Sequence, residues 1–197
     1  MKPIEAYSYY IYNDLDDIEI IELANYWLEN DEISNSFCQL CYVDTTNKEE
    51  IIELFEAGML ELNIVKPTLI EAGLIIIRRI LNQIVLHEID AMQGINYIYE
   101  NLHDKMSESL ENNFTGFSCS SPIYNNSEKS FREEASGINF NLVQLFGWER
   151  EIKDCISGSY LNFYSDIPRD KAELKMYKHL IEESKKWLEL DKLHNKF

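Results

Sequence analysis

Residues 67–89 read PTLIEAGLIIIRRILNQIVLHEI and form the most apolar run of the chain. At about 100° per residue, the leucine, isoleucine and valine side chains share one broad face, whereas Glu71 and Arg78 fall in a narrow polar strip. Thr68 and Glu71 have the spacing of a capping box, which predicts a helix over 68–88. The charged residues within the run argue against a membrane span, which needs about 20 predominantly apolar residues. The run therefore predicts a buried central helix.

The same periodicity predicts five further helices around this one. Asp14 is placed to cap the first, Thr46 with Glu49 forms a capping box for the second, and Asp90 with Gln93 supplies a related start for the third. The ranges are 15–29, 47–62, 91–104, a segment within 140–158 that Gly158 ends, and 171–190 with Asp170 as its cap. Asn63 is expected to end the helix over 47–62.

Three segments are not predicted as part of these helices. Residues 3–12 are rich in tyrosine and alternate loosely, which favours a short strand or an extended N-terminal arm. Periodicity does not distinguish helix from strand in residues 31–47. Residues 106–137 are rich in Ser, Asn and Glu and are expected to form a long loop. We therefore predict an all-α fold, a compact bundle of about six helices around the helix over 68–88, in a single domain over 1–197.

The charge balance limits the classes of partner. The chain has 197 residues, with Lys+Arg 18 against Asp+Glu 35, and a formal net charge of -17. Such a charge repels nucleic-acid phosphates and anionic lipid heads, so we expect neither nucleic acid nor a membrane as a partner. It attracts a basic protein, although acidity often serves solubility alone. The N-terminal sequence lacks the pattern of a signal peptide, which predicts a cytoplasmic location and reduced cysteines.

The acidic residues are concentrated on two of the predicted helices. If their faces adjoin, they form a negative surface for a basic protein, and nearby tyrosines would be the aromatic anchors of that interface. The alternative is that the two faces are independent and solvated. The candidate contact residues are Asp14, Asp16, Asp17, Glu49, Glu50, Glu53 and Glu56, and the candidate anchors are Tyr7, Tyr9, Tyr10 and Tyr12.

Two small motifs could carry chemistry. Cys38 and Cys41 have the CxxC spacing of zinc and redox sites, but the sequence offers no second ligand pair, and two thiols packed as small hydrophobes are the favoured interpretation. His103 and Asp104 form an HD dipeptide that, with His87, gives the alternative hypothesis of a small metal-dependent hydrolase. A histidine near a helix end is also explained by the helix dipole.

The remaining catalytic patterns are missing from the sequence. It contains no glycine-rich phosphate loop, GxSxG, HExxH or dinucleotide fingerprint. We therefore predict a protein without catalytic residues, resident metal or cofactor.

Residues 88–102, EIDAMQGINYIYENL, follow the apolar helix with an acidic turn and a helix that has an early glycine, Gly94. This pattern resembles small bacterial proteins of uncharacterised families, some of which are immunity proteins encoded beside secreted toxins. The turn departs from the pattern, because His87 and Ala91 stand where a glycine or proline is expected. The resemblance implies that the basic partner is a toxin, such as a nuclease domain, and transfers no functional residue to this chain.

Overall fold

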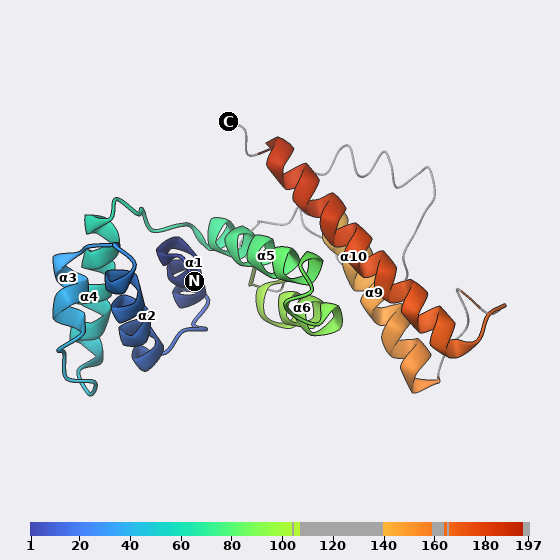
Figure 1. Ribbon diagram of the computed structural model, residues 1–197, viewed down its shortest axis with the longest axis horizontal. Coiled ribbons are helices and arrows are strands. Elements are labelled where there is room, and N and C mark those ends of the chain that lie inside the picture. The colour runs from blue at the N-terminus through green and yellow to red at the C-terminus, as the bar shows by residue number, and fades with distance from the viewer. Residues whose placement is uncertain (104, 107–139, 159–163, 165, 195–197) are drawn as a thin grey trace. The chain divides into compact units, whose positions relative to one another are not determined.

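The computed structural model describes residues 1–103, 105–106, 140–158, 164 and 166–194. Every regular element among them is helical, so the all-α prediction is confirmed. The chain divides into two compact units, unit 1 (Met1–Ile76) and unit 2 (Ile77–Phe197). Figure 1 labels the helices. The single domain stays a prediction. The predicted loop at 106–137 lies, apart from its first residue, outside the described part of the chain.

The apolar run forms helix α5 (Leu69–Val85). Its capping box is present, since the Glu71 amide donates to Thr68 Oγ1 at 3.3 Å and the Thr68 amide donates to the Glu71 carboxylate at 2.8 Å. The residues of its apolar face that are buried are Ala72, Ile76, Ile77, Ile80, Leu81 and Ile84. No helix in the described part of the chain has the length and apolarity needed to cross a membrane.

Unit 1 contains the first part of α5 and the four helices that precede it: α1 (Pro3–Ile11), α2 (Asp17–Glu29), α3 (Asn35–Leu40) and α4 (Lys48–Glu61). At its centre the Trp27 ring lies 5.2 Å from the Phe37 ring and 6.5 Å from the Phe55 ring. All three side chains are at most 1% exposed. Burying an aromatic or aliphatic side chain contributes about 1.5–3 kcal/mol, so this aromatic centre is a main source of stability for unit 1.

The expected N-terminal arm or strand is wrong, because residues 3–11 form helix α1. Pro3 occupies the first helical position, where its missing N–H is no loss, and the Glu5 carboxylate accepts from the Lys2 amide at 2.9 Å. Tyr7 is buried and packs edge-on against Phe55, with ring centroids 5.5 Å apart. Core packing thus overrides the strand preference of the tyrosines.

The segment whose structure the sequence left open contains helix α3. Ser34 caps it, accepting from the Phe37 amide at 3.1 Å. The hydroxyls of Ser36 and Ser34 both donate to the carboxylate of Glu61 at 2.7 Å, and they hold the pKa of Glu61 below its usual range. The Phe37 ring lies against Gly58 so closely that a Cβ added there would be 2.2 Å from Phe37 Cε1. These contacts fasten α3 to α4.

Two predicted helix caps are displaced along the chain. Asp16, rather than Asp14, caps α2 by accepting from two amides at 2.8 and 2.9 Å. Asn47, rather than Thr46, caps α4. The Thr46 hydroxyl instead donates to the Asp44 carboxylate at 2.8 Å in the preceding turn, so it is already engaged.

Four helices end without glycine at the position that requires a positive φ. At the end of α4, Asn63 has φ 58, and the Ile64 amide donates to the Met59 carbonyl at 2.9 Å, which is the bond of a Schellman motif. Asn63 is thereby confirmed as the end of its helix. The corresponding residues of α1, α2, α4 and α5 are Asn13, Asp31, Asn63 and His87.

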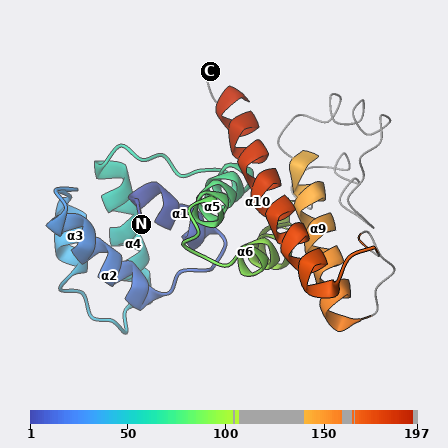
Figure 2. The same ribbon diagram turned by 45° about the vertical axis from the view of Figure 1, so that its right-hand side comes forward.

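Unit 2 contains α6 (Ala91–Tyr97), the π-helix η1 (Ile98–His103), α9 (Phe140–Ser157) and α10 (Arg169–His194), and α9 and α10 lie side by side (Figures 1 and 2). The predicted helix over 91–104 is therefore α6 continued by η1, and Asp90 caps it. A Cβ at Gly94 would be 2.8 Å from Ile84 Cδ1, so Gly94 permits close packing of α6 on α5. Arg78 of α5 pairs with Asp191 of α10 through two hydrogen bonds of 2.6 and 2.8 Å.

Candidate partner-binding site

Most of the net charge belongs to unit 1. Its residues 1–76 include 16 Asp and Glu against 3 Lys and no Arg, a formal charge of -13 out of the chain's -17. The residues from 77 onward carry the other 19 acidic side chains together with 15 Lys and Arg. Electrostatic attraction for a cation is therefore concentrated on unit 1.

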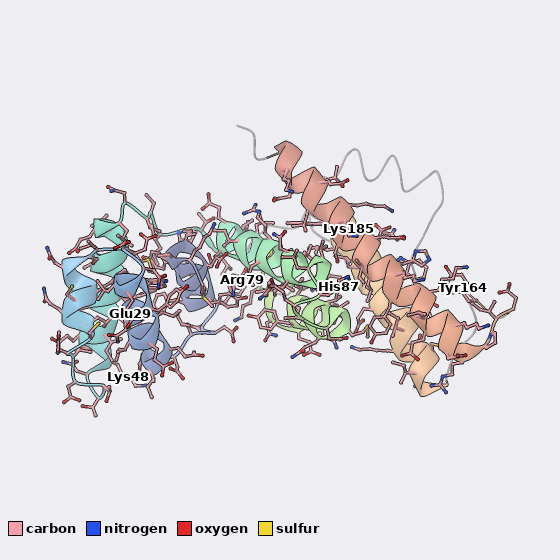
Figure 3. All side chains as sticks on the ribbon, in the orientation of Figure 1. Glu29, Lys48, Arg79, His87, Tyr164 and Lys185 are labelled. Atoms are coloured by element: carbon pink, nitrogen blue, oxygen red, sulfur yellow. The ribbon has the colours of Figure 1, made fainter. Side chains whose placement is uncertain are left out.

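The carboxylates of the first acidic cluster are largely engaged within unit 1. Asp16 caps α2 and Asp17 pairs with Lys48 of α4 at 3.4 Å. Asp14 is exposed in the turn before α2. The ion pair brings the start of α2 next to the start of α4, where Figure 3 labels Lys48. The two acidic faces thus adjoin at their N-terminal ends, with one lysine between them.

The carboxylates of α4 divide into engaged and solvated groups. Glu50 accepts from the Asn47 side-chain amide at 2.8 Å, and Glu56 accepts from Lys66 Nζ at 2.6 Å. Glu49 and Glu53 are exposed and form no ion pair with any described residue. These two carboxylates are free to meet a partner.

Glu49, Glu53 and Glu56 lie on one stripe of α4, because their spacing of four and three residues returns to the same helix face. One turn beyond Glu56 on that stripe is Leu60, which is 72% exposed. A carboxylate row ending in an exposed apolar side chain offers both steering charge and a contact that excludes water. We call these four residues the α4 stripe.

The predicted aromatic anchors are wrong for two of the four tyrosines. Tyr7 is 4% exposed and Tyr12 is 2% exposed, so both belong to the interior of unit 1. The Tyr12 hydroxyl donates to the Leu69 carbonyl at 3.0 Å, and burial raises the pKa of Tyr12 to about 12. Tyr9 and Tyr10 are half-buried. Leu60, by contrast, is a largely exposed apolar side chain of the α4 stripe.

Lys66 occupies a small site on unit 1 that the sequence did not reveal. Its Nζ lies 5.9 Å from the ring centroids of both Tyr7 and Tyr10, in addition to its hydrogen bond with Glu56. That hydrogen bond raises the pKa of Lys66, so its ammonium group is charged at neutral pH. A signal existed in the sequence, since Lys66 is one of only three cationic side chains among residues 1–76.

The residues of the hydrolase hypothesis do not form a metal site in the described part of the chain. His87 is exposed at the end of α5, where it takes the positive φ of the Schellman motif (Figure 3). His103 stacks on Tyr99 at 5.4 Å in η1. Asp104 lies outside the described residues, within which no three His, Cys, Asp or Glu side chains gather as metal ligands would. The structure accounts for His87 as a helix end, and the hydrolase stays an untested alternative.

Cys38 lies in α3 and Cys41 directly follows it, and both are free thiols. Cys38 is exposed, whereas Cys41 is partly buried and its Sγ lies 3.2 Å from the Phe37 carbonyl. Burial raises the pKa of the Cys41 thiol and the adjacent Cys38 adds to the rise, which lowers its thiolate content and its reactivity. The interpretation as packed thiols therefore fits Cys41 and is wrong for Cys38, which is exposed.

Unit 2 contains a polar cluster that sequence reasoning missed. The Tyr164 hydroxyl is hydrogen-bonded to His179 Nε2 at 2.6 Å, Glu182 lies 3.4 Å from His179 Nδ1, and the indole of Trp148 stacks on the imidazole at 4.3 Å. These side chains come from α9, α10 and the connection between them, so no spacing in the sequence predicts the cluster. The hydrogen bond fastens Tyr164, in that connection, to α10.

Comparison of the chain with protein-family models, curated proteins and solved structures finds no significant match.

Proposed function

We propose that this protein is a non-enzymatic binding protein whose acidic unit 1 receives a basic protein. The observation that carries the proposal is the concentration of charge, -13 on residues 1–76, together with the solvated carboxylates Glu49 and Glu53 on the α4 stripe. Charges of this kind steer a basic partner during encounter and exclude acidic competitors.

The partner class that we propose is a toxin with a nuclease-like basic face, as the resemblance of residues 88–102 to immunity proteins implies. A nuclease uses Lys and Arg side chains to hold the phosphates of its substrate. An acidic protein surface competes for the same side chains. Unit 1 would then neutralise the partner by covering its substrate-binding face, without any chemical step.

The test is affinity capture at low salt from an extract of the source cells. The wild-type protein is compared with Glu49→Lys/Glu53→Lys, and with the matched control Glu100→Lys/Glu189→Lys, which makes the same charge change at exposed positions of unit 2. We expect a basic protein that moderate salt releases, bound by wild type and control, and about 10–100-fold more weakly by the α4 variant.

The captured protein is then assayed for nucleic-acid cleavage with and without added wild-type protein. Inhibition by the wild type and not by the α4 variant supports neutralisation. Recovery of the same proteins by the wild type and the α4 variant would refute the assignment of the surface.

A further inference from the structure

Three side chains of unit 1 surround the ammonium group of Lys66. Glu56 of α4 binds it at 2.6 Å, and the rings of Tyr7 and Tyr10 on α1 lie 5.9 Å from Nζ. Both distances from the rings are within the range of about 6 Å over which an aromatic ring attracts a cation. A carboxylate and two aromatic faces are a typical set of groups for binding an alkylammonium ion. We call these three side chains the ammonium site.

The positions of these groups depend on the core rather than on Lys66. Tyr7 and Tyr10 pack on the buried Phe55 ring, with centroids 5.5 and 5.3 Å from it. Glu56 follows Phe55 on the same helix. Lys66, by contrast, comes from the short connection between α4 and α5. The site is therefore preorganised by α1 and α4, and Lys66 is an occupant that the connection delivers to it.

The site is open to solvent on the side of Lys66 and Glu56, whereas the Tyr7 side chain, which is 4% exposed, is covered in the free protein. The side chain of Lys66 is 55% exposed and that of Glu56 is 39% exposed, so neither group is enclosed. Contacts between exposed charges and between exposed cations and rings are each weak, and such contacts exchange readily. Glu56 is also a member of the α4 stripe, so a partner lying along Glu49 and Glu53 reaches the ammonium site.

We propose that the ammonium site binds a lysine side chain of the basic partner, and that Lys66 occupies it in the free protein as an internal competitor. This inference rests on the proposed function, because it names the point on unit 1 at which one cation of the partner is held. Binding replaces one ammonium group by another, so the released Lys66 carries its charge into solvent and no bond is made or broken.

An internal competitor lowers the apparent affinity by the fraction of molecules in which the site is vacant. If Lys66 occupies the site in about nine of ten molecules, removing it raises the affinity for a lysine side chain about 10-fold. Loss of one positive charge from unit 1 also favours a cationic ligand, and the experiment must separate this effect from vacancy of the site.

Lys48 provides the matched control. Like Lys66, it is an exposed lysine of unit 1 paired with a carboxylate, Asp17, and its removal changes the charge by the same amount. It differs in that no aromatic ring lies against it among the described residues. Lys66→Met and Lys48→Met therefore have the same electrostatic effect and differ in the ammonium site.

The experiment measures binding of a decalysine peptide to the full chain by isothermal titration calorimetry at low salt. We expect Lys66→Met to bind about 10-fold more tightly than the wild type and Lys48→Met to bind only about 2-fold more tightly, since it removes a charge alone. Adding Tyr10→Leu to Lys66→Met is expected to remove most of the gain, with circular dichroism verifying that the helices remain.

Equal affinities of Lys66→Met and Lys48→Met would overturn the ammonium site, and so would a gain that survives Tyr10→Leu. If these variants bind alike while Glu49→Lys/Glu53→Lys binds decalysine weakly, the ammonium site fails and the acidic surface of the proposed function stands. If Lys66→Met shows its gain but no basic protein is captured from the extract, the ammonium site stands and the proposed partner fails.

Discussion

Replacement of Gly58 by alanine has two opposing effects on stability, a gain in helix propensity and a steric clash in the core. Gly58 lies inside α4, where alanine is the better helix former by about 1 kcal/mol. The added Cβ, however, would lie 2.2, 2.3 and 2.9 Å from three atoms of the Phe37 ring, far below ordinary contact distances of about 3.5–4 Å. Overpacking a rigid core costs about 1–3 kcal/mol, and a clash with three ring atoms belongs at the upper end.

The Phe37 ring has little freedom to move away. It is fully buried and its centroid is 5.2 Å from that of Trp27. The steric term should therefore exceed the helix-propensity term, and we expect Gly58→Ala to lower the free energy of unfolding of unit 1 by about 2 kcal/mol.

The assay is equilibrium urea unfolding with hydrogen exchange of the α4 amides as the readout of unit 1. Ala57→Gly, at the exposed neighbouring position, is the control for helix propensity and should cost about 1 kcal/mol. In a Phe37→Val background the three ring atoms are missing, and Gly58→Ala should become stabilising by up to about 1 kcal/mol. The packing argument would be refuted if Gly58→Ala stabilised the wild-type protein, or if it destabilised the Phe37→Val variant as much as the wild type.

Three further substitutions test other contacts. His87→Gly should raise the free energy of unfolding by about 0.5–1 kcal/mol, because glycine accepts the positive φ at the end of α5 without strain. Thermal unfolding measures this change, and a lower stability of the variant would contradict the role of His87 as a helix end. Glu61→Gln should cost about 1 kcal/mol at pH 7. Ser34 and Ser36 lower the pKa of Glu61 in the folded protein, so the stabilisation by its carboxylate is complete above the unfolded pKa of about 4.3 and is lost as the pH falls through the lower folded pKa. In urea titrations, the stabilities of the wild type and Glu61→Gln should therefore converge at low pH and differ at high pH. Arg78→Met should cost about 3 kcal/mol because it removes both hydrogen bonds from Arg78 to the carboxylate of Asp191, which is 5% exposed. Arg78→Met/Asp191→Leu should recover most of this loss in the same assay.

Helix existence was predictable from the sequence because an apolar stripe repeats over many residues, so single misjudged positions do not change it. All six predicted helices form in the described residues, and the capping box at Thr68 and the helix cap at Asp90 are where the sequence placed them. The errors in the predicted helix caps occur where the choice depends on a single residue. Asp14 and Asp16 have the same side chain, but Asp16 is followed three residues later by Glu19, whose carboxylate accepts from the Asp16 amide at 2.9 Å and completes a capping box.

The candidate site was predictable in outline and not in detail. Sequence identified the acidic faces of α2 and α4, since composition alone shows them. It could not show that Asp17 is neutralised by Lys48 or Glu56 by Lys66, because each pair joins side chains from different elements. The concentration of charge on residues 1–76 was hidden as well, since the limit of unit 1 falls inside the continuous helix α5, without a linker to mark it.

The division between engaged and solvated carboxylates determines which substitutions report on function. Reversing Asp16 removes a helix cap, which by itself costs about 0.5–2 kcal/mol, so lost binding by such a variant would not separate contact from folding. Glu53 has no such structural partner among the described residues, and its reversal should relieve the self-repulsion of unit 1. Glu49 lies in the first turn of α4, where a negative charge interacts favourably with the helix dipole, so its reversal also removes a stabilising interaction. Glu53→Lys should therefore be at least as stable as the wild type while binding the basic partner more weakly. Added salt should likewise stabilise the free protein, because it screens the repulsion between the like charges of unit 1. It should weaken the complex, because it screens the attraction between the acidic surface and the basic partner. Opposite changes in stability and affinity are the signature that distinguishes a binding surface from acidity that serves solubility.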